Sequence, residues 1–177
     1  MARRELTGIL LVGGASRRFG SPKALARFNG TTFAELAWGV LGEACRERIA
    51  FGKAHDELPL PFPVYDDGTP VRAPLAGVVA GLRAAKHDVC VFVPVDVPFV
   101  TPGLVRELGE ACREAAVPSA SPLPAAYARA ALPVLERRLL GGELALREAL
   151  AELDTVTVEV DGRLLVNVNA PEELAAL

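Results

Sequence analysis

A glycine-containing loop near the N-terminus gives the strongest signal for ligand binding. The apolar run Leu6 to Val12 leads directly into Gly13 and Gly14, and basic side chains follow. Adjacent glycines let the backbone approach a ligand closely, and exposed backbone N–H groups can surround phosphate oxygens. The basic residues are Arg17, Arg18, Lys23 and Arg27. Since arginine and lysine suit a polyphosphate, the loop predicts phosphate binding, with a tight turn bearing solvated basic residues as the alternative.

The loop differs from two common phosphate-binding motifs. It lacks the G-x-x-x-x-G-K-[ST] pattern of a P-loop. It also lacks the G-x-G-x-x-G pattern of dinucleotide-binding domains. The prediction therefore depends on the glycine pair and on the basic residues that follow a buried strand.

Asp96 is a candidate metal ligand because of its position in Pro94-Val95-Asp96-Val97-Pro98. It directly follows a strongly apolar segment, and the flanking prolines restrict its backbone. Mg²⁺ favours one or two carboxylates together with substrate phosphate oxygens. The alternative is an ordinary capping or loop aspartate. A phosphate-binding loop elsewhere in the sequence favours the metal interpretation.

Two further polar pairs follow predicted strands. Asp66 and Asp67 precede Gly68, where they are either turn-forming residues or acceptors for a base or sugar. Asn167 and Asn169 are two residues apart, so they share one face of an extended segment. Either asparagine could bind a polar ligand, although Asn169 also suits a cap before Pro171.

Composition narrows the class of protein. The 177 residues favour a single domain spanning 1–177, with 51% hydrophobic residues and a net charge of −3. This balance argues against a disordered chain and against a basic nucleic-acid binder. The apolar run Val89 to Val100 is broken by Asp96 and is too short to span a membrane. Three widely spaced cysteines predict free thiols in a reducing compartment, so we expect a cytoplasmic protein.

The pattern of apolar segments predicts a doubly wound α/β domain with a mostly parallel sheet and a C-terminal β-hairpin and helix. Thr32 with Glu35 forms a capping-box pattern, and Thr101-Pro102 resembles another helix start. The sequence predicts strands at 6–12, 48–51, 62–65, 88–95 and 125–129, the hairpin over 155–168, and helices beginning near 32, 74, 101, 131, 143 and 171. Ligands bind such sheets at the carboxyl ends of the strands, where the glycine loop, Asp66-Asp67 and Asp96 are expected.

Taken in order, four segments resemble the molybdenum cofactor guanylyltransferase family. They are Leu11 to Lys23, Ala73 to Gly77, Pro94 to Pro98 and Asn167 to Leu174. These segments are similar to the family patterns L-A-G-G-x-S-x-R-M-G-x-x-K, G-P-L-A-G, P-x-D-x-P and N-x-N-T-P-E-[DE]-L. The departures are Val12 for Ala, Phe19 for Met, Ala73 for Gly and Ala170 for Thr. The resemblance spans nearly the whole chain and implies a Rossmann-like nucleotidyltransferase fold.

The resemblance implies transfer of GMP from GTP to the phosphate of molybdopterin, with Mg²⁺ as cofactor. It leaves other molybdenum-cofactor enzymes as candidate partners and implies neither a nucleic-acid nor a membrane partner. By position, it assigns nucleotide contacts to Leu11, Val12, Gly13, Gly14, Lys23, Asp67 and Asp96, phosphate and catalytic contacts to Arg18, Lys23 and Asp96, the metal to Asp96, and pterin-side contacts to Asn167 and Asn169. The family asparagine after the second strand has no counterpart in Phe51-Gly52-Lys53.

The nearest alternative is a cytidylyltransferase of the same fold. In the families, L-A-G-G accompanies guanine and L-A-A-G accompanies cytosine, so Gly14 favours GTP. Sugar-phosphate nucleotidyltransferases are further relatives. A nucleotide-binding protein without turnover is a different class, against which the intact Lys23 and Asp96 argue.

Overall fold

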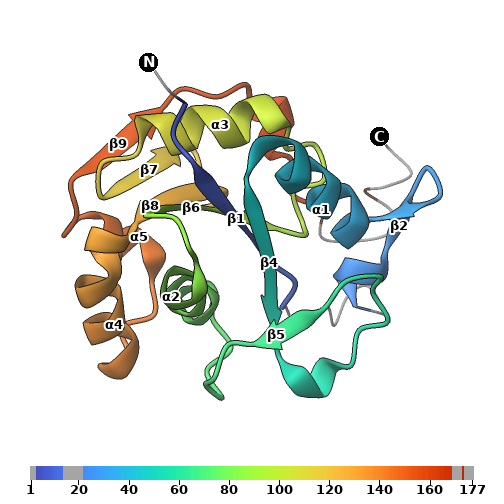
Figure 1. Ribbon diagram of the computed structural model, residues 1–177, viewed down its shortest axis with the longest axis horizontal. Helices are drawn as coiled ribbons and strands as arrows, with labels where there is room; N and C mark the ends of the chain where they lie inside the picture. The colour runs from blue at the N-terminus through green and yellow to red at the C-terminus, as the bar shows by residue number, and fades with distance from the viewer. Residues whose placement is uncertain (1–2, 14–21, 169–172, 174–177) are drawn as a thin grey trace.

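The computed structural model describes residues 3–13, 22–168 and 173. In this part of the chain, seven strands form one sheet in the order β5-β4-β1-β6-β8-β7-β9, and helices cover both faces (Figure 1). The strands are β1 (Leu6–Leu11), β4 (Glu47–Gly52), β5 (Val64–Asp66), β6 (Val89–Pro94), β7 (Ala115–Pro118), β8 (Ala125–Ala128) and β9 (Thr155–Val158). The predicted α/β sheet is therefore confirmed.

The central strand β1 has parallel neighbours on both sides. It pairs with β4 on one side and with β6 on the other, and all six of its residues are buried. The chain first builds outward through β4 to β5 and then returns to place β6 on the opposite side of β1. The strand order thus reverses between β1 and β6, which creates a crevice at their carboxyl ends.

Two helical layers bury the two faces of the sheet. Helices α1 and α3 lie on one face, where they pack against Leu6 and Leu10 of β1. Helices α2, α4 and α5 lie on the other face with Ile9 and Leu11. Because successive side chains of β1 point to opposite faces of the sheet, this strand contributes residues to both hydrophobic cores. The helices are α1 (Phe33–Ala44), α2 (Pro74–Ala84), α3 (Pro102–Ala111), α4 (Leu132–Leu140) and α5 (Leu146–Leu150).

Local sequence signals explain where two of these helices begin. The Thr32 hydroxyl accepts the Glu35 N–H, and the Glu35 carboxylate accepts the Thr32 N–H, which confirms the predicted capping box. The Thr101 hydroxyl accepts the Leu104 N–H at the start of α3, where Pro102 is the first helical residue. These caps satisfy backbone donors that the first helical turn leaves without partners.

The predicted C-terminal hairpin is wrong. Strand β9 pairs in parallel with β7 at the edge of the sheet, and a 3₁₀ helix, η4 (Gly162–Leu165), follows in place of a returning strand. The Asp161 carboxylate accepts the Arg163 N–H and starts that helix. Leu164 and Leu165 of this 3₁₀ helix pack against the core. The predicted closing helix over 171–177 falls outside the described residues except for Glu173.

The segment predicted as one long loop, Gly13 to Gly30, contains regular structure in its described part. A 3₁₀ helix, η1 (Lys23–Leu25), is followed by β2 (Arg27–Phe28) and β3 (Thr31–Thr32), which form a small antiparallel pair. The Arg27 guanidinium donates to the Gly30 carbonyl at 2.7 Å in that turn. Arg27 is therefore used locally and does not line the cavity described below.

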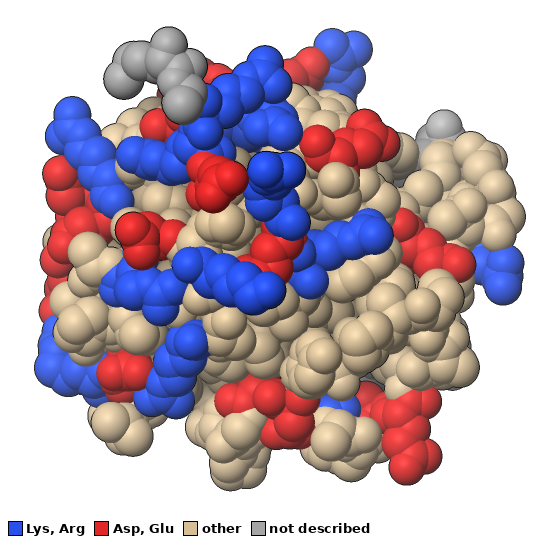
Figure 2. Space-filling model, in the orientation of Figure 1, with Lys and Arg blue, Asp and Glu red and all other residues tan. Residues whose placement is uncertain are grey.

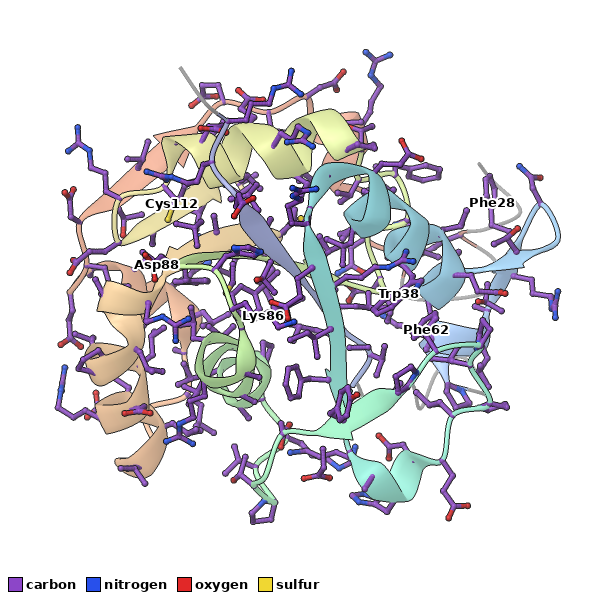
Figure 3. All side chains as sticks on the ribbon, viewed as in Figure 1. Phe28, Trp38, Phe62, Lys86, Asp88 and Cys112 are labelled. Atoms are coloured by element: carbon purple, nitrogen blue, oxygen red, sulfur yellow. The ribbon has the colours of Figure 1, made fainter. Side chains whose placement is uncertain are left out.

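A stacked aromatic pair and a surface of mixed charge are two further features of the fold. Trp38 is half-buried on α1 and stacks on Phe62 with ring centroids 4.2 Å apart (Figure 3). Lys and Arg are interspersed with Asp and Glu on the face viewed in Figure 2, so this face carries mixed charge. Among the described residues, no helix combines the length and apolarity needed to cross a membrane.

Candidate active site

A cavity of about 460 Å³ lies at the carboxyl ends of β1, β4 and β6. This volume falls in the range of small-molecule binding sites. Segments far apart in the sequence meet at its walls, as expected for the point where the strand order reverses. The lining residues are Leu11, Gly13, Phe51, Gly52, Lys53, Asp67, Arg72, Ala73, Pro74, Gly77, Pro94, Asp96, Val97, Ser121, Pro122, Leu123, Leu165 and Asn167.

Asp96 lines this cavity and pairs with Lys23, which is far from it in the sequence. The Lys23 Nζ lies 3.7 Å from the Asp96 Oδ2, and the two side chains keep 17% and 28% of their surface exposed. The two groups are therefore adjacent and accessible to a ligand. This pairing places a cation and a metal-compatible carboxylate at one point, which suits a substrate carrying several phosphates.

The end of β1 forms part of the cavity wall, and helix α2 packs closely against it. Leu11 and Gly13 line the cavity, whereas Val12 is buried and donates its N–H to the Phe51 carbonyl at 3.0 Å. A Cβ on Gly77 would lie 2.5 Å from the Leu11 Cδ2, so glycine lets α2 pack directly on β1. The predicted site residues Gly14 and Arg18, and the basic Arg17, lie outside the described residues.

Asp66 and Asp67 have different roles in the structure. The Asp66 carboxylate accepts the N–H groups of Ala54 and Gly68, each at 2.7 Å, and these hydrogen bonds lower the pKa of Asp66 below its usual range. Asp67 instead lines the cavity and forms a buried ion pair with Lys53 at 2.6 Å. Asp66 therefore holds the turn, and Asp67 is the residue that can face a ligand.

The opposite wall of the cavity includes Asn167. The next residue, Val168, is fully buried and donates its N–H to the Asp96 carbonyl at 2.9 Å. This hydrogen bond attaches the C-terminal segment to the end of β6 and holds Asn167 beside the cavity. Asn169, the second predicted pterin-side asparagine, lies outside the described residues.

Several lining residues were given no role by reasoning from the sequence. Lys53 follows β4, Arg72 precedes α2, and residues 121–123 lie between β7 and β8. Their sequence neighbourhoods contain no glycine pair or strand-end carboxylate motif. The position of Lys53 after a short apolar strand was the available signal, because it matches the strand-end position of Asp96.

The three cysteines do not supply a thiolate nucleophile for covalent catalysis. Burial raises the pKa of Cys45 and Cys90 to about 12 and that of Cys112 to about 11, so these thiols stay protonated near neutral pH. No group of three or more His, Cys, Asp or Glu side chains in the described part of the chain could hold a metal ion alone. The features present at the site, the Lys23–Asp96 pair and the cavity beside it, suit the binding and charge stabilisation of a ligand.

A cavity at the carboxyl ends of parallel strands, at the point where the strand order reverses, is typical of α/β domains that bind nucleotides. The family model for the MobA-like NTP transferase domain matches residues 8–174. The chain belongs to this family of nucleotidyltransferases.

This chain is similar to known proteins in both sequence and fold. The molybdenum cofactor guanylyltransferase of Burkholderia vietnamiensis is 34% identical over 195 residues, which cover 98% of this chain and 95% of the relative. The crystal structure of molybdopterin-guanine dinucleotide biosynthesis protein A from Archaeoglobus fulgidus matches with a TM-score of 0.83 at 24% identity, covering 96% and 95% of the two chains. The 2-C-methyl-D-erythritol 4-phosphate cytidylyltransferase of Thermus thermophilus shares the fold, with a TM-score of 0.74, 19% identity and 95% coverage of each chain.

Proposed function

We propose that this protein transfers GMP from GTP to the terminal phosphate of molybdopterin. The products are molybdopterin guanine dinucleotide and pyrophosphate. The observation that carries this proposal is the meeting of Lys23 and Asp96 at 3.7 Å beside a cavity that can receive a nucleotide. The name of the Burkholderia relative, a guanylyltransferase similar along almost its whole length, supports the choice of donor and acceptor.

The chemistry requires positioning and charge neutralisation. A phosphate oxygen of the acceptor forms a bond to the α-phosphorus of GTP, and the bond from that phosphorus to the bridging oxygen breaks. The pyrophosphate leaves with the electron pair. Because the attacking oxygen is already anionic, the protein needs neither its own nucleophile nor a strong general base. Lys23 and Arg18 would hold the phosphates as charge moves to the leaving group.

The donor set around Asp96 fits Mg²⁺. The ion prefers one or two carboxylates and completes its coordination with phosphate oxygens and water. Asp96 offers one partly exposed carboxylate at the cavity, next to the place where phosphates would contact Lys23. When bound, Mg²⁺ would neutralise charge on the triphosphate. Asp96 would hold the ion, and the hydrogen bond from Val168 to its backbone would keep the loop in place.

The remaining residues divide between the two substrates in this proposal. Leu11, Gly13 and Asp67, which line the cavity, would contact the nucleotide, and Asn167, which also lines it, would contact the pterin. Val12 would act through its backbone, because its side chain is buried. Gly14 and Asn169 complete the two sides by their positions in the sequence. Free thiols at Cys45, Cys90 and Cys112 support a cytoplasmic location.

A pyrophosphate-release assay with GTP or CTP, with and without molybdopterin, tests the proposal. We expect Mg²⁺-dependent release that requires both GTP and molybdopterin, and none after chelation with EDTA. Release with CTP but not with GTP would contradict the guanine assignment and favour the activity of the cytidylyltransferases that share the fold. Failure of any nucleotide to release pyrophosphate in the presence of molybdopterin would contradict the transferase reaction itself.

A further inference from the structure

Lys53 is the most deeply buried charged side chain at the cavity. Its side chain is 6% exposed and that of its partner Asp67 is 7% exposed. The Lys53 Nζ donates to Asp67 Oδ1 at 2.6 Å, to Asp67 Oδ2 at 2.8 Å and to the Thr69 carbonyl at 2.6 Å. An ammonium group has three N–H donors, so this set uses all of them. Lys53 therefore has no donor left for a ligand.

Asp67 retains a smaller capacity to accept hydrogen bonds. Its Oδ1 accepts from Lys53 and from the Thr69 N–H at 3.2 Å, whereas its Oδ2 accepts from Lys53 alone among the described residues. A carboxylate has about four acceptor positions, and three are taken. One position on Oδ2 remains for a group in the cavity. Asp67 can thus accept a single N–H or O–H from a ligand, but not two adjacent donors through both oxygens.

The backbone around this pair fixes its place at the cavity wall. Lys53 directly follows β4, and the Asp67 N–H donates to the Gly52 carbonyl at 3.2 Å. A Cβ on Gly52 would lie 2.7 Å from the Val12 Cγ2, so glycine allows β4 to end tightly against the residue after β1. The ends of β1 and β4 and the turn after β5 therefore hold Lys53 and Asp67 in one arrangement.

We propose that Lys53 is a positioning residue for nucleotide binding that acts through Asp67. It holds the Asp67 carboxylate in one orientation, so that one oxygen accepts a hydrogen bond from the base or ribose of the bound nucleotide. This inference rests on the proposed nucleotidyl transfer and adds a residue to it. Lys53 makes no contact with the reacting phosphates in this arrangement, so it contributes to nucleotide affinity and not to the chemical step.

A double-mutant cycle on the full-length protein tests this role. Lys53→Met keeps an unbranched apolar side chain and removes the charge, and Asp67→Asn removes the charged acceptor. The Kd of GTP is measured by titration calorimetry, and KM and kcat by pyrophosphate release, for wild type, both single variants and the double variant. Lys86→Met is the matched control, because Lys86 is 82% exposed and lies outside the cavity. Circular dichroism establishes that each variant folds.

We expect Lys53→Met and Asp67→Asn each to raise the Kd and KM for GTP by roughly tenfold, as for loss of a hydrogen bond to a charged group. The value of kcat should change less than about threefold, since the lost contact is equally present before and during reaction. The double variant should match Asp67→Asn, and Lys86→Met should match wild type. If Lys53 and Asp67 had only a structural role, the variants would lower stability, but they would not raise the KM for GTP while leaving kcat nearly unchanged.

Other results would overturn the inference. A further loss of affinity when Lys53→Met is added to Asp67→Asn would show that Lys53 contacts the nucleotide itself. Unchanged affinity in Asp67→Asn, or a loss confined to kcat, would also contradict it. If Lys53→Met alone fails to fold, the comparison of Asp67→Asn with the double variant still decides. If wild type uses CTP and not GTP, the proposed function is wrong in its nucleotide, and the same cycle is measured with CTP.

Discussion

Replacement of Asp96 by alanine is expected to lower turnover at least about 100-fold while leaving the fold intact, because removal of a preorganised electrostatic group costs this much in other enzymes. The carboxylate is partly exposed at the cavity and makes its ion pair with Lys23 at 3.7 Å. The structural hydrogen bond from Val168 goes to the Asp96 backbone carbonyl, which alanine retains. Steady-state pyrophosphate release with GTP, molybdopterin and Mg²⁺ measures the effect, and circular dichroism checks the fold.

Asp88→Ala provides a matched control at the other end of β6. Asp88 directly precedes β6, at the end opposite Asp96, and its side chain is 92% exposed (Figure 3). It pairs with Arg129 at 3.4 Å on the surface, where ion pairs contribute little. Turnover of this variant should equal that of wild type. A near-normal Mg²⁺-dependent rate in Asp96→Ala would refute the assignment of Asp96 as the metal-holding residue.

The largest effect on stability is expected from Phe92→Ala in the middle of β6. Phe92 is fully buried, and its ring packs edge-on against Tyr127 with centroids 5.7 Å apart. A Cβ on Gly81 would lie 2.7 Å from the Phe92 ring, so α2 closes tightly over this side chain. Truncation of such a phenylalanine costs about 3–5 kcal/mol, because it loses apolar burial and leaves a cavity. For a protein of this size, the Tm should fall by roughly 10 °C.

Thermal and urea unfolding measure this change. Leu140→Ala is the control, because Leu140 is 87% exposed at the end of α4 and should change stability by no more than about 0.5 kcal/mol. If Phe92→Ala unfolds at the same temperature as wild type, the packing of α2 against the sheet at Phe92 is not as the structure describes. The variant should keep nucleotide affinity below its lower Tm, since Phe92 does not line the cavity.

The sequence by itself determined the local elements whose signals lie within a few residues. The buried strand before Gly13, the capping box at Thr32 and the start of α3 at Thr101 all follow from apolar runs and caps. The sequence also determined that Asp96 follows a buried strand. Parallel strands bring their carboxyl ends to one edge, so the meeting of Lys23 and Asp96 could be anticipated from the order of the elements.

Only the tertiary structure decided how segments with ambiguous patterns are used. The alternation over 163–168 predicts a strand paired with 155–160, yet the chain leaves the edge strand β9, forms η4 and returns to the residue Asp96 after β6 through the Val168 N–H. Strand β7 itself, rich in alanine, lacks a strong strand signal and forms because both neighbours supply hydrogen bonds.

The same holds for the two adjacent aspartates. Nothing in Asp66-Asp67-Gly68 distinguishes one carboxylate from the other. The difference arises because Asp66 turns back to the N–H groups of Ala54 and Gly68, while Asp67 meets Lys53 across the ends of two strands. A buried ammonium must find acceptors, and the packing of β4 beside β5 supplies them. The tertiary structure therefore places Asp67 at the cavity. It also places Lys53 there as the partner of Asp67, which the residue types alone could not reveal.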